Sequence, residues 1–207
     1  MKIQKNISFI GYSGHAYVCI ETAQLLGYTV TGYHDFQELE QNPYNLRFLG
    51  PEEQFEQHDG FLFGSIGNNN IREKVFRTIS AIKRDMFVSL LHPSATLSKT
   101  ATIDTNVLIS AGAIVNALSN IGIGAIINTG AIVEHECTIK AFAHIAPGAT
   151  LAGNVTVGKR SFIGAGAVVK QGVTIGNDVI VGAGAVIIKD IPDNLTVVGN
   201  PAKRLIK

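Results

Sequence analysis

The sequence predicts two different folds in one chain of 207 residues: an α/β domain of Rossmann-like type, followed by a parallel β-helix. Aliphatic residues return at every sixth position through the second half of the chain, and small residues hold a fixed place within that period. The first ninety residues lack this period and alternate short strand-like segments with helical ones. Such alternation is typical of a parallel sheet covered by helices.

The first ninety residues are predicted to form a small nucleotide-binding domain. Residues 6–11 indicate a buried strand, 14–27 a helix and 28–33 a second strand, which together make one βαβ unit. A strand over 60–64, a helix over 70–83 and a further strand at 86–89 extend the sheet. The boundary falls near His92-Pro93, so the predicted domains span 1–92 and 93–207.

Two turns of this domain follow predicted strands. The segment Gly11–His15 places backbone N–H groups at a helix N-terminus, where a pyrophosphate is favoured, although a plain tight turn would look similar. Asp35 follows the second strand, where an acidic side chain often meets a ribose or a base edge. Gly67 lies in an asparagine-rich turn that also caps a helix. We expect Ser13, Asp35 and Gly67 to meet at one sheet edge.

From Leu97 to Ile187, sixteen consecutive positions in steps of six are aliphatic. The residue two positions earlier is small or β-branched each time, as a narrow triangular prism requires. Each hexapeptide then forms a short strand and a corner, and three hexapeptides close a coil of eighteen residues. One predicted stack consists of Val115, Val133, Leu151, Val169 and Ile187. Glycines after the periodic residue, such as Gly122 and Gly164, suit corners with a strained φ or a crowded backbone.

Composition argues against several classes of function. Lys and Arg number 17 and Asp and Glu 16, a formal charge of +1 that is too balanced for binding to nucleic acid or an anionic membrane. No run of eighteen apolar residues and no signal-peptide pattern occurs, so we expect neither membrane insertion nor secretion. Cys19 and Cys137 have no metal-ligand spacing. These features predict a globular cytoplasmic protein.

Two histidines, His135 and His144, lie within the repeat, where a narrow prism has little use for them. His135 lies two positions after an inward aliphatic residue and should point outward beside Glu136. A carboxylate that binds one imidazole nitrogen leaves the other nitrogen available as a base, so His135 could be a general base. The alternative is that His135 is an ordinary exposed histidine.

A zinc-dependent hydratase on the same β-helix would need three histidines at one metal ion. Half a coil separates His135 from His144, so they cannot share a zinc ion within one chain. Histidines of different subunits could still converge, but the repeat contains no third one, and we expect no metal.

The repeat allows two further interpretations. Cys137 could be an acyl-enzyme nucleophile, but it falls in the small inward register and is expected in the core. A structural or ice-binding solenoid would show ranks of outward threonines, and the threonines of this sequence look scattered.

Several segments together resemble a known family. They are Gly11–His15, Gly67–Arg72, Asn128-Thr129, Val133–Cys137, His144-Ile145 and Val198–Arg204. The chain resembles the nucleotide-sugar N-acetyltransferases with hexapeptide repeats, particularly those that acetylate UDP-4-amino-4,6-dideoxy-N-acetylglucosamine in bacterial protein glycosylation, and the related sialic-acid O-acetyltransferases. The resemblance implies left-handed winding of the β-helix, a homotrimer, acetyl-CoA as co-substrate and a UDP- or dTDP-linked 4-amino sugar as acceptor.

The resemblance also implies roles for individual residues. His135 corresponds to the general base and Glu136 to its carboxylate partner. The residues that correspond to acetyl-CoA contacts are His144, Ala165 and Ala183. Those that correspond to the substrate pocket are Ser13, Gly14, His15, Asp35, Gly67 and Asn128. Tyr12, Ala16 and His34 depart from the family pattern, which leaves the nucleotide open. Direct attack of the amine on the thioester is the expected mechanism, with O-acetylation of a sugar hydroxyl as the alternative.

Overall fold

The computed structural model describes residues 5–51 and 60–205, and the chain divides into two compact units, residues 1–93 and 94–207. Residues 1–4, 52–59 and 206–207 lie outside the described ranges. In the described part no helix is long and apolar enough to cross a membrane.

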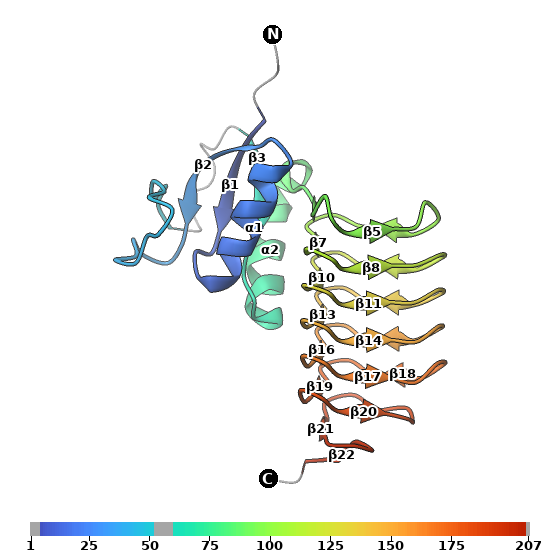
Figure 1. The fold of residues 1–207 in the computed structure, drawn as a ribbon. Coiled ribbons are helices and arrows are strands. Elements are labelled where there is room, and N and C mark those ends of the chain that lie inside the picture. The colour runs from blue at the N-terminus through green and yellow to red at the C-terminus, as the bar shows by residue number, and fades with distance from the viewer. Residues whose placement is uncertain (1–4, 52–59, 206–207) are drawn as a thin grey trace. The chain divides into compact units, whose positions relative to one another are not determined.

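The first unit contains a three-stranded parallel sheet in the order β2-β1-β3 (Figure 1). The strands are β1 (Asn6–Ile10), β2 (Thr29–His34) and β3 (Phe61–Gly64). Helix α1 (Gly14–Leu25) follows β1, and helix α2 (Asn69–Lys83) follows β3. Buried apolar side chains of β1, such as Phe9 and Ile10, fill the core. The two predicted turns follow the carboxyl ends of β1 and β3, one after each strand.

The strand predicted at 86–89 is not formed. Arg84–Met86 continues the chain as a 3-10 turn (η2), so only the next residues can reach the sheet. Phe87 makes a single parallel bridge to Leu62, and the N–H of Val88 donates to the carbonyl of Leu62 over 3.1 Å. A two-residue strand, β4 (Leu90–Leu91), follows.

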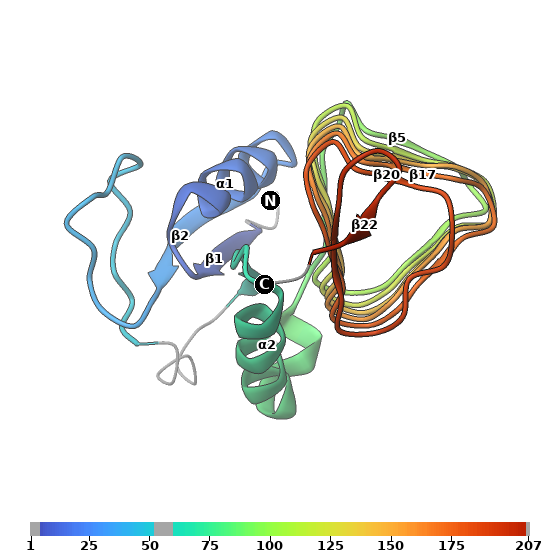
Figure 2. The ribbon, with the colours of Figure 1, turned by 90° about the horizontal axis from the view of Figure 1, so that it is seen from below.

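The second unit is a parallel β-solenoid with a triangular cross-section (Figure 2). Its first face carries β7 (Leu108–Ile109), β10 (Ile126–Ile127), β13 (His144–Ile145), β16 (Phe162–Ile163), β19 (Ile180–Val181), β21 (Thr196–Val198) and β22 (Lys203–Arg204). Its second face carries β5 (Thr96–Leu97), β8 (Ile114–Val115), β11 (Ile132–Val133), β14 (Thr150–Leu151), β17 (Val168–Val169) and β20 (Val186–Ile187). Its third face carries β6 (Thr102–Ile103), β9 (Asn120–Ile121), β12 (Thr138–Ile139), β15 (Thr156–Val157) and β18 (Thr174–Ile175).

The register of the coils is the predicted eighteen residues. Val133 pairs with Val115 and with Leu151, and the same step continues through Val169 to Ile187. All five side chains of this stack are fully buried. At the C-terminal end β21 pairs antiparallel with β22, so the last segment turns back on the final coil.

The glycines that follow the periodic aliphatic residue relieve crowding and do not adopt a strained φ. An ideal Cβ on Gly122 would lie 2.9 Å from the N atom of Ala141 and 3.0 Å from the carbonyl oxygen of Ile139. The residues with a left-handed φ lie instead three positions after the periodic residue, as at Gly124 and Glu136. Only the crowding part of the sequence interpretation is therefore correct.

The outward threonines are not scattered, contrary to expectation. Parallel pairing aligns four of them with one asparagine along the third face, in the order Thr102, Asn120, Thr138, Thr156 and Thr174. These residues are spaced eighteen positions apart, one coil each, and this period is not evident when threonines are counted along the chain. The third face is consequently polar, whereas the second face presents Ile114, Ile132 and Val168 among its outward residues.

Candidate functional site

His135 lies at the corner that follows the second face, which we call the histidine corner (residues 134–137, 152–155, 170–173 and 188–191). Its Nδ1 atom is 2.9 Å from Oε2 of Glu136, and about half of each side chain is exposed, at 48% and 55%. Glu136 has a left-handed φ of 61°, and its N–H donates to the carbonyl of Ala117 over 2.8 Å. The imidazole therefore has a carboxylate partner on one nitrogen and solvent access, as a general base requires.

Gly153, eighteen residues after His135, makes room for the imidazole on the neighbouring coil. An ideal Cβ on Gly153 would lie 2.5 Å from Nε2 and 3.0 Å from Nδ1 of His135. Its φ lies outside the left-handed region, so the ring, and not the backbone conformation, requires glycine there. Gly153 is not among the site residues predicted from the sequence, although the eighteen-residue step from His135 points to it.

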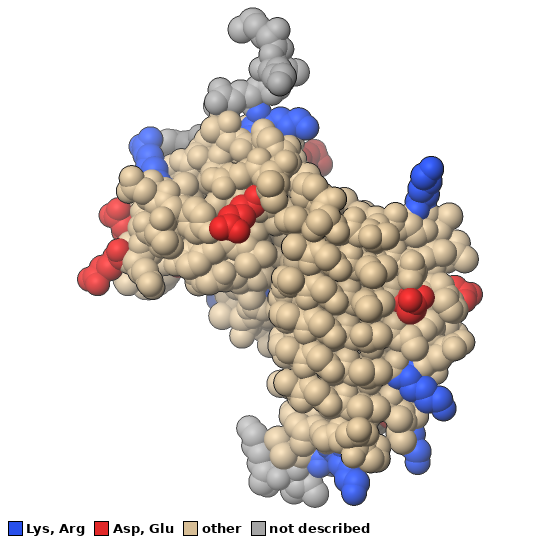
Figure 3. Space-filling model, viewed as in Figure 1, with Lys and Arg blue, Asp and Glu red and all other residues tan. Residues whose placement is uncertain are grey.

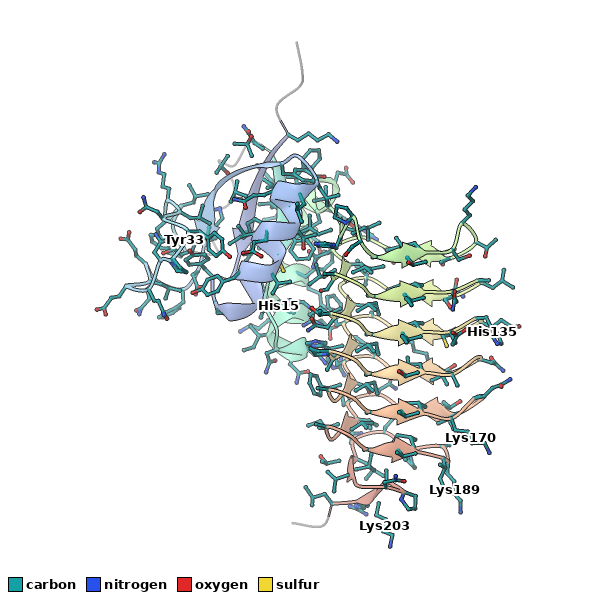
Figure 4. The ribbon with its side chains drawn as sticks, in the orientation of Figure 1. His15, Tyr33, His135, Lys170, Lys189 and Lys203 are labelled. Carbon is teal, nitrogen blue, oxygen red and sulfur yellow. The ribbon has the colours of Figure 1, made fainter. Side chains whose placement is uncertain are left out.

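The histidine corner becomes basic toward the C-terminal end of the β-helix. Figure 4 shows His135, Lys170 and Lys189 in this order along one side, with Lys203 at the end, and Figure 3 shows basic side chains gathered there. A hollow at this end is lined by Ile187, Ile188, Lys189, Ile191, Pro201, Ala202 and Lys203. The acidic neighbour Asp190 accepts a hydrogen bond from the N–H of Thr174 through Oδ1, at 2.8 Å.

The corner that follows the first face is an exposed ridge of main chain, which we call the glycine corner (residues 111–113, 129–131, 147–149, 165–167 and 183–185). Ala165 and Ala183 lie there on successive coils, and the N–H of Gly184 donates to the carbonyl of Ala165 over 2.8 Å. Stacked glycines with a left-handed φ continue the ridge, and an added Cβ would meet nothing within 4 Å at Gly112, Gly130, Gly148, Gly166 and Gly184. A ligand can approach the backbone closely at such a ridge.

Asn128 and His144 lie next to the glycine corner on the first face. Nδ2 of Asn128 is 3.1 Å from Nε2 of His144, and the imidazole packs edge-on against Phe162 with ring centroids 5.0 Å apart. His144 is only 7% exposed. The structure therefore brings these two predicted site residues together.

The predicted nucleotide-site residues also meet at one edge of the first unit. Asp35 accepts hydrogen bonds from the N–H of Tyr12 at Oδ2 (2.8 Å) and from the N–H of Phe36 at Oδ1 (2.7 Å). Gly67 approaches the same turn from β3, because an ideal Cβ there would lie 3.7 Å from Cβ of His15. Ser13 and Gly14 start helix α1 between these contacts.

His15 and Arg72 give this edge its electrostatic character. Burial, followed by the nearby charge of Arg72, lowers the pKa of His15 to about 4, so the imidazole is neutral at pH 7. The Arg72 guanidinium donates to the carbonyls of Ile66 and Gly67 over 2.9 Å and 3.1 Å, and burial lowers its pKa to about 9. Arg72 thereby fixes the second turn, a role that its sequence motif alone did not reveal.

Cys137 is part of the core of the β-helix. Burial raises the pKa of its thiol, and Sγ lies 3.2 Å from the carbonyl oxygen of Ala152. A protonated thiol directed at a carbonyl is a poor nucleophile. Within residues 5–51 and 60–205, no group of three or more His, Cys, Asp or Glu residues could hold a metal ion.

The structure separates the predicted β-helix site residues into two groups. His135 and Glu136 lie at the histidine corner, whereas Ala165 and Ala183 lie at the glycine corner with Asn128 and His144 beside it. The whole second face separates these corners in each coil.

Comparison with known proteins finds a match for each of the two units of the chain. Residues 6–79 match the PglD N-terminal domain, and residues 154–189 match the bacterial transferase hexapeptide family. A variant of perosamine N-acetyltransferase from Caulobacter crescentus, in complex with CoA and GDP-perosamine, is 38% identical with a TM-score of 0.91, covering 98% of this chain and 97% of its own. The acetyltransferase domain of PglB from Neisseria gonorrhoeae, in complex with acetyl coenzyme A, is 36% identical with a TM-score of 0.91, covering 98% and 100%.

A β-helix of hexapeptide repeats joined to an α/β domain of this kind defines a class of acyltransferases. The chain belongs to the family of bacterial sugar N-acetyltransferases that contain a PglD-type N-terminal domain, and it is an acetyltransferase. The predicted fold, an α/β domain with a left-handed type of β-helix, is confirmed.

Replacing Gly153 by alanine is expected to lower kcat about tenfold or more, because the new methyl group displaces the His135 ring from its place. The measurement is the steady-state rate of Gly153→Ala, His135→Ala and the double variant, with thermal unfolding of each. If Gly153 acts only through the imidazole, the double variant is no slower than His135→Ala. A further loss in the double variant would contradict this role.

Proposed function

We propose that the protein transfers the acetyl group of acetyl-CoA to the 4-amino group of a nucleotide-linked amino-deoxy sugar. The observation that carries the proposal is the exposed His135–Glu136 pair in a chain that matches, over 98% of its length, an N-acetyltransferase in complex with CoA and GDP-perosamine. The nucleotide that carries the sugar is UDP, dTDP or GDP. The turns at the carboxyl ends of β1 and β3 support its binding, because helix N-termini attract phosphates.

The chemistry is a direct transfer in which His135 acts as general base. The neutral amine attacks the thioester carbonyl while Nε2 of His135 accepts the proton that the amine loses. Collapse of the tetrahedral intermediate breaks the C–S bond, and the proton passes to the departing CoA sulfur. Glu136 holds Nδ1–H, so that the tautomer with Nε2 as acceptor is favoured. Backbone N–H groups at a glycine-rich corner are suited to the oxyanion.

The basic end of the histidine corner supports a direction for acetyl-CoA. Lys189 lies three coils below His135, roughly 14 Å along the axis at about 4.8 Å between neighbouring strands. The bonds from the CoA sulfur to its first phosphorus span about 16 Å when extended. With the thioester beside His135, the phosphates would therefore meet Lys189 and Lys203 at the hollow.

The separation of the two corners supports a homotrimer with shared sites. One face of six residues lies between them, about 20 Å at roughly 3.3 Å per residue. An extended acetyl-CoA that runs along the axis cannot contact both corners of the same chain. It can contact both if a second copy supplies the glycine corner, which cyclic symmetry then repeats at every interface.

The first test of the proposed function is release of free CoA from acetyl-CoA with UDP-, dTDP- and GDP-linked 4-amino sugars. We expect turnover with one of these amino sugars and none with the corresponding sugar that carries a hydroxyl group instead. Turnover with the hydroxyl sugar alone would establish O-acetylation and overturn the proposal of N-acetylation.

His135→Ala is expected to lower kcat about 10²- to 10⁴-fold with the fold intact, because the base is lost. Glu136→Gln should cost less, since the base remains and only its partner changes. The measurement is kcat at saturating concentrations of both substrates, with circular dichroism as the control for folding. A near-normal rate for His135→Ala would contradict its assignment as the base.

Complementation tests the shared site. His135→Ala removes the base, and Ala165→Trp blocks the glycine corner, so each variant alone is expected to be inactive. Co-expressed in equal amounts and assembled at random, they form a population of trimers in which about a quarter of all interfaces join two intact corners, because each mixed trimer has one such interface among its three. We expect roughly a quarter of the wild-type activity. Mixed trimers, verified by two affinity tags, that remain inactive would show that each site lies within one subunit.

A further inference from the structure

Phe36 is the most exposed large apolar side chain among those described, with 85% of its surface accessible, whereas the others reach at most 60%. Single exposed apolar residues are common in proteins, so exposure alone indicates little. The position of Phe36 is more informative. It directly follows Asp35 at the carboxyl end of β2, next to the turn that ends β1.

The backbone of Phe36 is fixed to that turn. Asp35 bridges the two, because its Oδ1 accepts from the N–H of Phe36 over 2.7 Å and its Oδ2 accepts from the N–H of Tyr12 over 2.8 Å. Both carboxylate oxygens thus bind main chain. We regard Asp35 as a positioning residue that sets the place of Phe36 relative to the helix N-terminus.

The segment after Phe36 is held as well. The hydroxyl of Tyr33 accepts from the N–H of Leu39 over 3.0 Å. The hydroxyl of Tyr12 donates to Oδ1 of Asn42 over 2.7 Å and accepts from the N–H of Tyr44 over 3.2 Å. The rings of Tyr12 and Tyr33 stack with centroids 4.3 Å apart. These contacts anchor the segment, so Phe36 remains at the edge of the sheet.

We propose that the ring of Phe36 is the platform on which the nucleobase of the sugar nucleotide stacks. The inference rests on the proposed function, which places a nucleotide at this edge. A diphosphate at the N-terminus of α1 leaves the nucleoside to extend over the end of the neighbouring strand, β2, in domains of this topology. Stacking on an aromatic ring uses the face of the base and tolerates different bases.

The absence of tryptophan from the sequence gives a direct readout. Phe36→Trp creates a single indole, and we expect titration with GDP or UDP to quench its fluorescence in a saturable manner. Ile82→Trp is the matched control, because Ile82 is a 60% exposed residue near the C-terminal end of α2. Its emission should stay constant. Unchanged emission of Phe36→Trp, with nucleotide binding verified by calorimetry, would overturn the proposal.

Truncation provides the second measurement. Phe36→Ala is expected to raise the Kd of GDP and UDP about tenfold to a hundredfold, with Phe36→Leu in between and the Kd of acetyl-CoA unchanged. An unchanged nucleotide Kd for Phe36→Ala would also overturn the proposal. The two hypotheses fail separately: acetyl transfer without quenching contradicts only the role of Phe36. Quenching without transfer to any amino sugar contradicts only the proposed function.

Discussion

The narrow interior of the β-helix is the constraint on which the rest of the structure depends. Only aliphatic or small side chains fit inward, and the hydroxyls of the two inward serines bond to the main chain nearby. Ser119 donates to the carbonyl of Glu134 over 2.8 Å, and Ser161 donates to that of Gly176 over 2.6 Å. Since the interior has no room for a ligand, chemistry is confined to the faces and the corners. The corners carry His135, the main-chain ridge, Lys170 and Lys189.

The repeat made the fold of the second unit predictable, because each coil imposes the same requirement on the same position. Val115 and Ile187 could be placed on one stack from spacing alone. The position of the left-handed backbone was less evident, since Gly, Asn, Asp and even Glu136 occupy it. Contacts that join residues eighteen apart, such as His135 over Gly153, emerge only when the chain is wound into coils.

The first unit was predictable at the level of strands and turns, whereas the hydrogen-bond partners of individual side chains were not. The position of Asp35 after β2 indicated a nucleotide contact, yet both of its oxygens accept from main-chain N–H groups. Arg72 belongs to a motif of the resemblance, but its bonds to the second turn depend on how α2 packs. Sequence spacing locates such residues, whereas geometry decides which atoms remain for a ligand.

The stacking of coils at a regular spacing fixes the distances between residues along the histidine corner. Each coil adds one strand spacing, about 4.8 Å, between His135 and the lysines at the end of the β-helix. An insertion or deletion of eighteen residues in this interval would preserve every pairing and the core. It would nevertheless leave a fixed-length acyl carrier too short or too long by one step. The proposed position of acetyl-CoA therefore implies that the number of coils in this interval is fixed by the length of the carrier and not by folding alone.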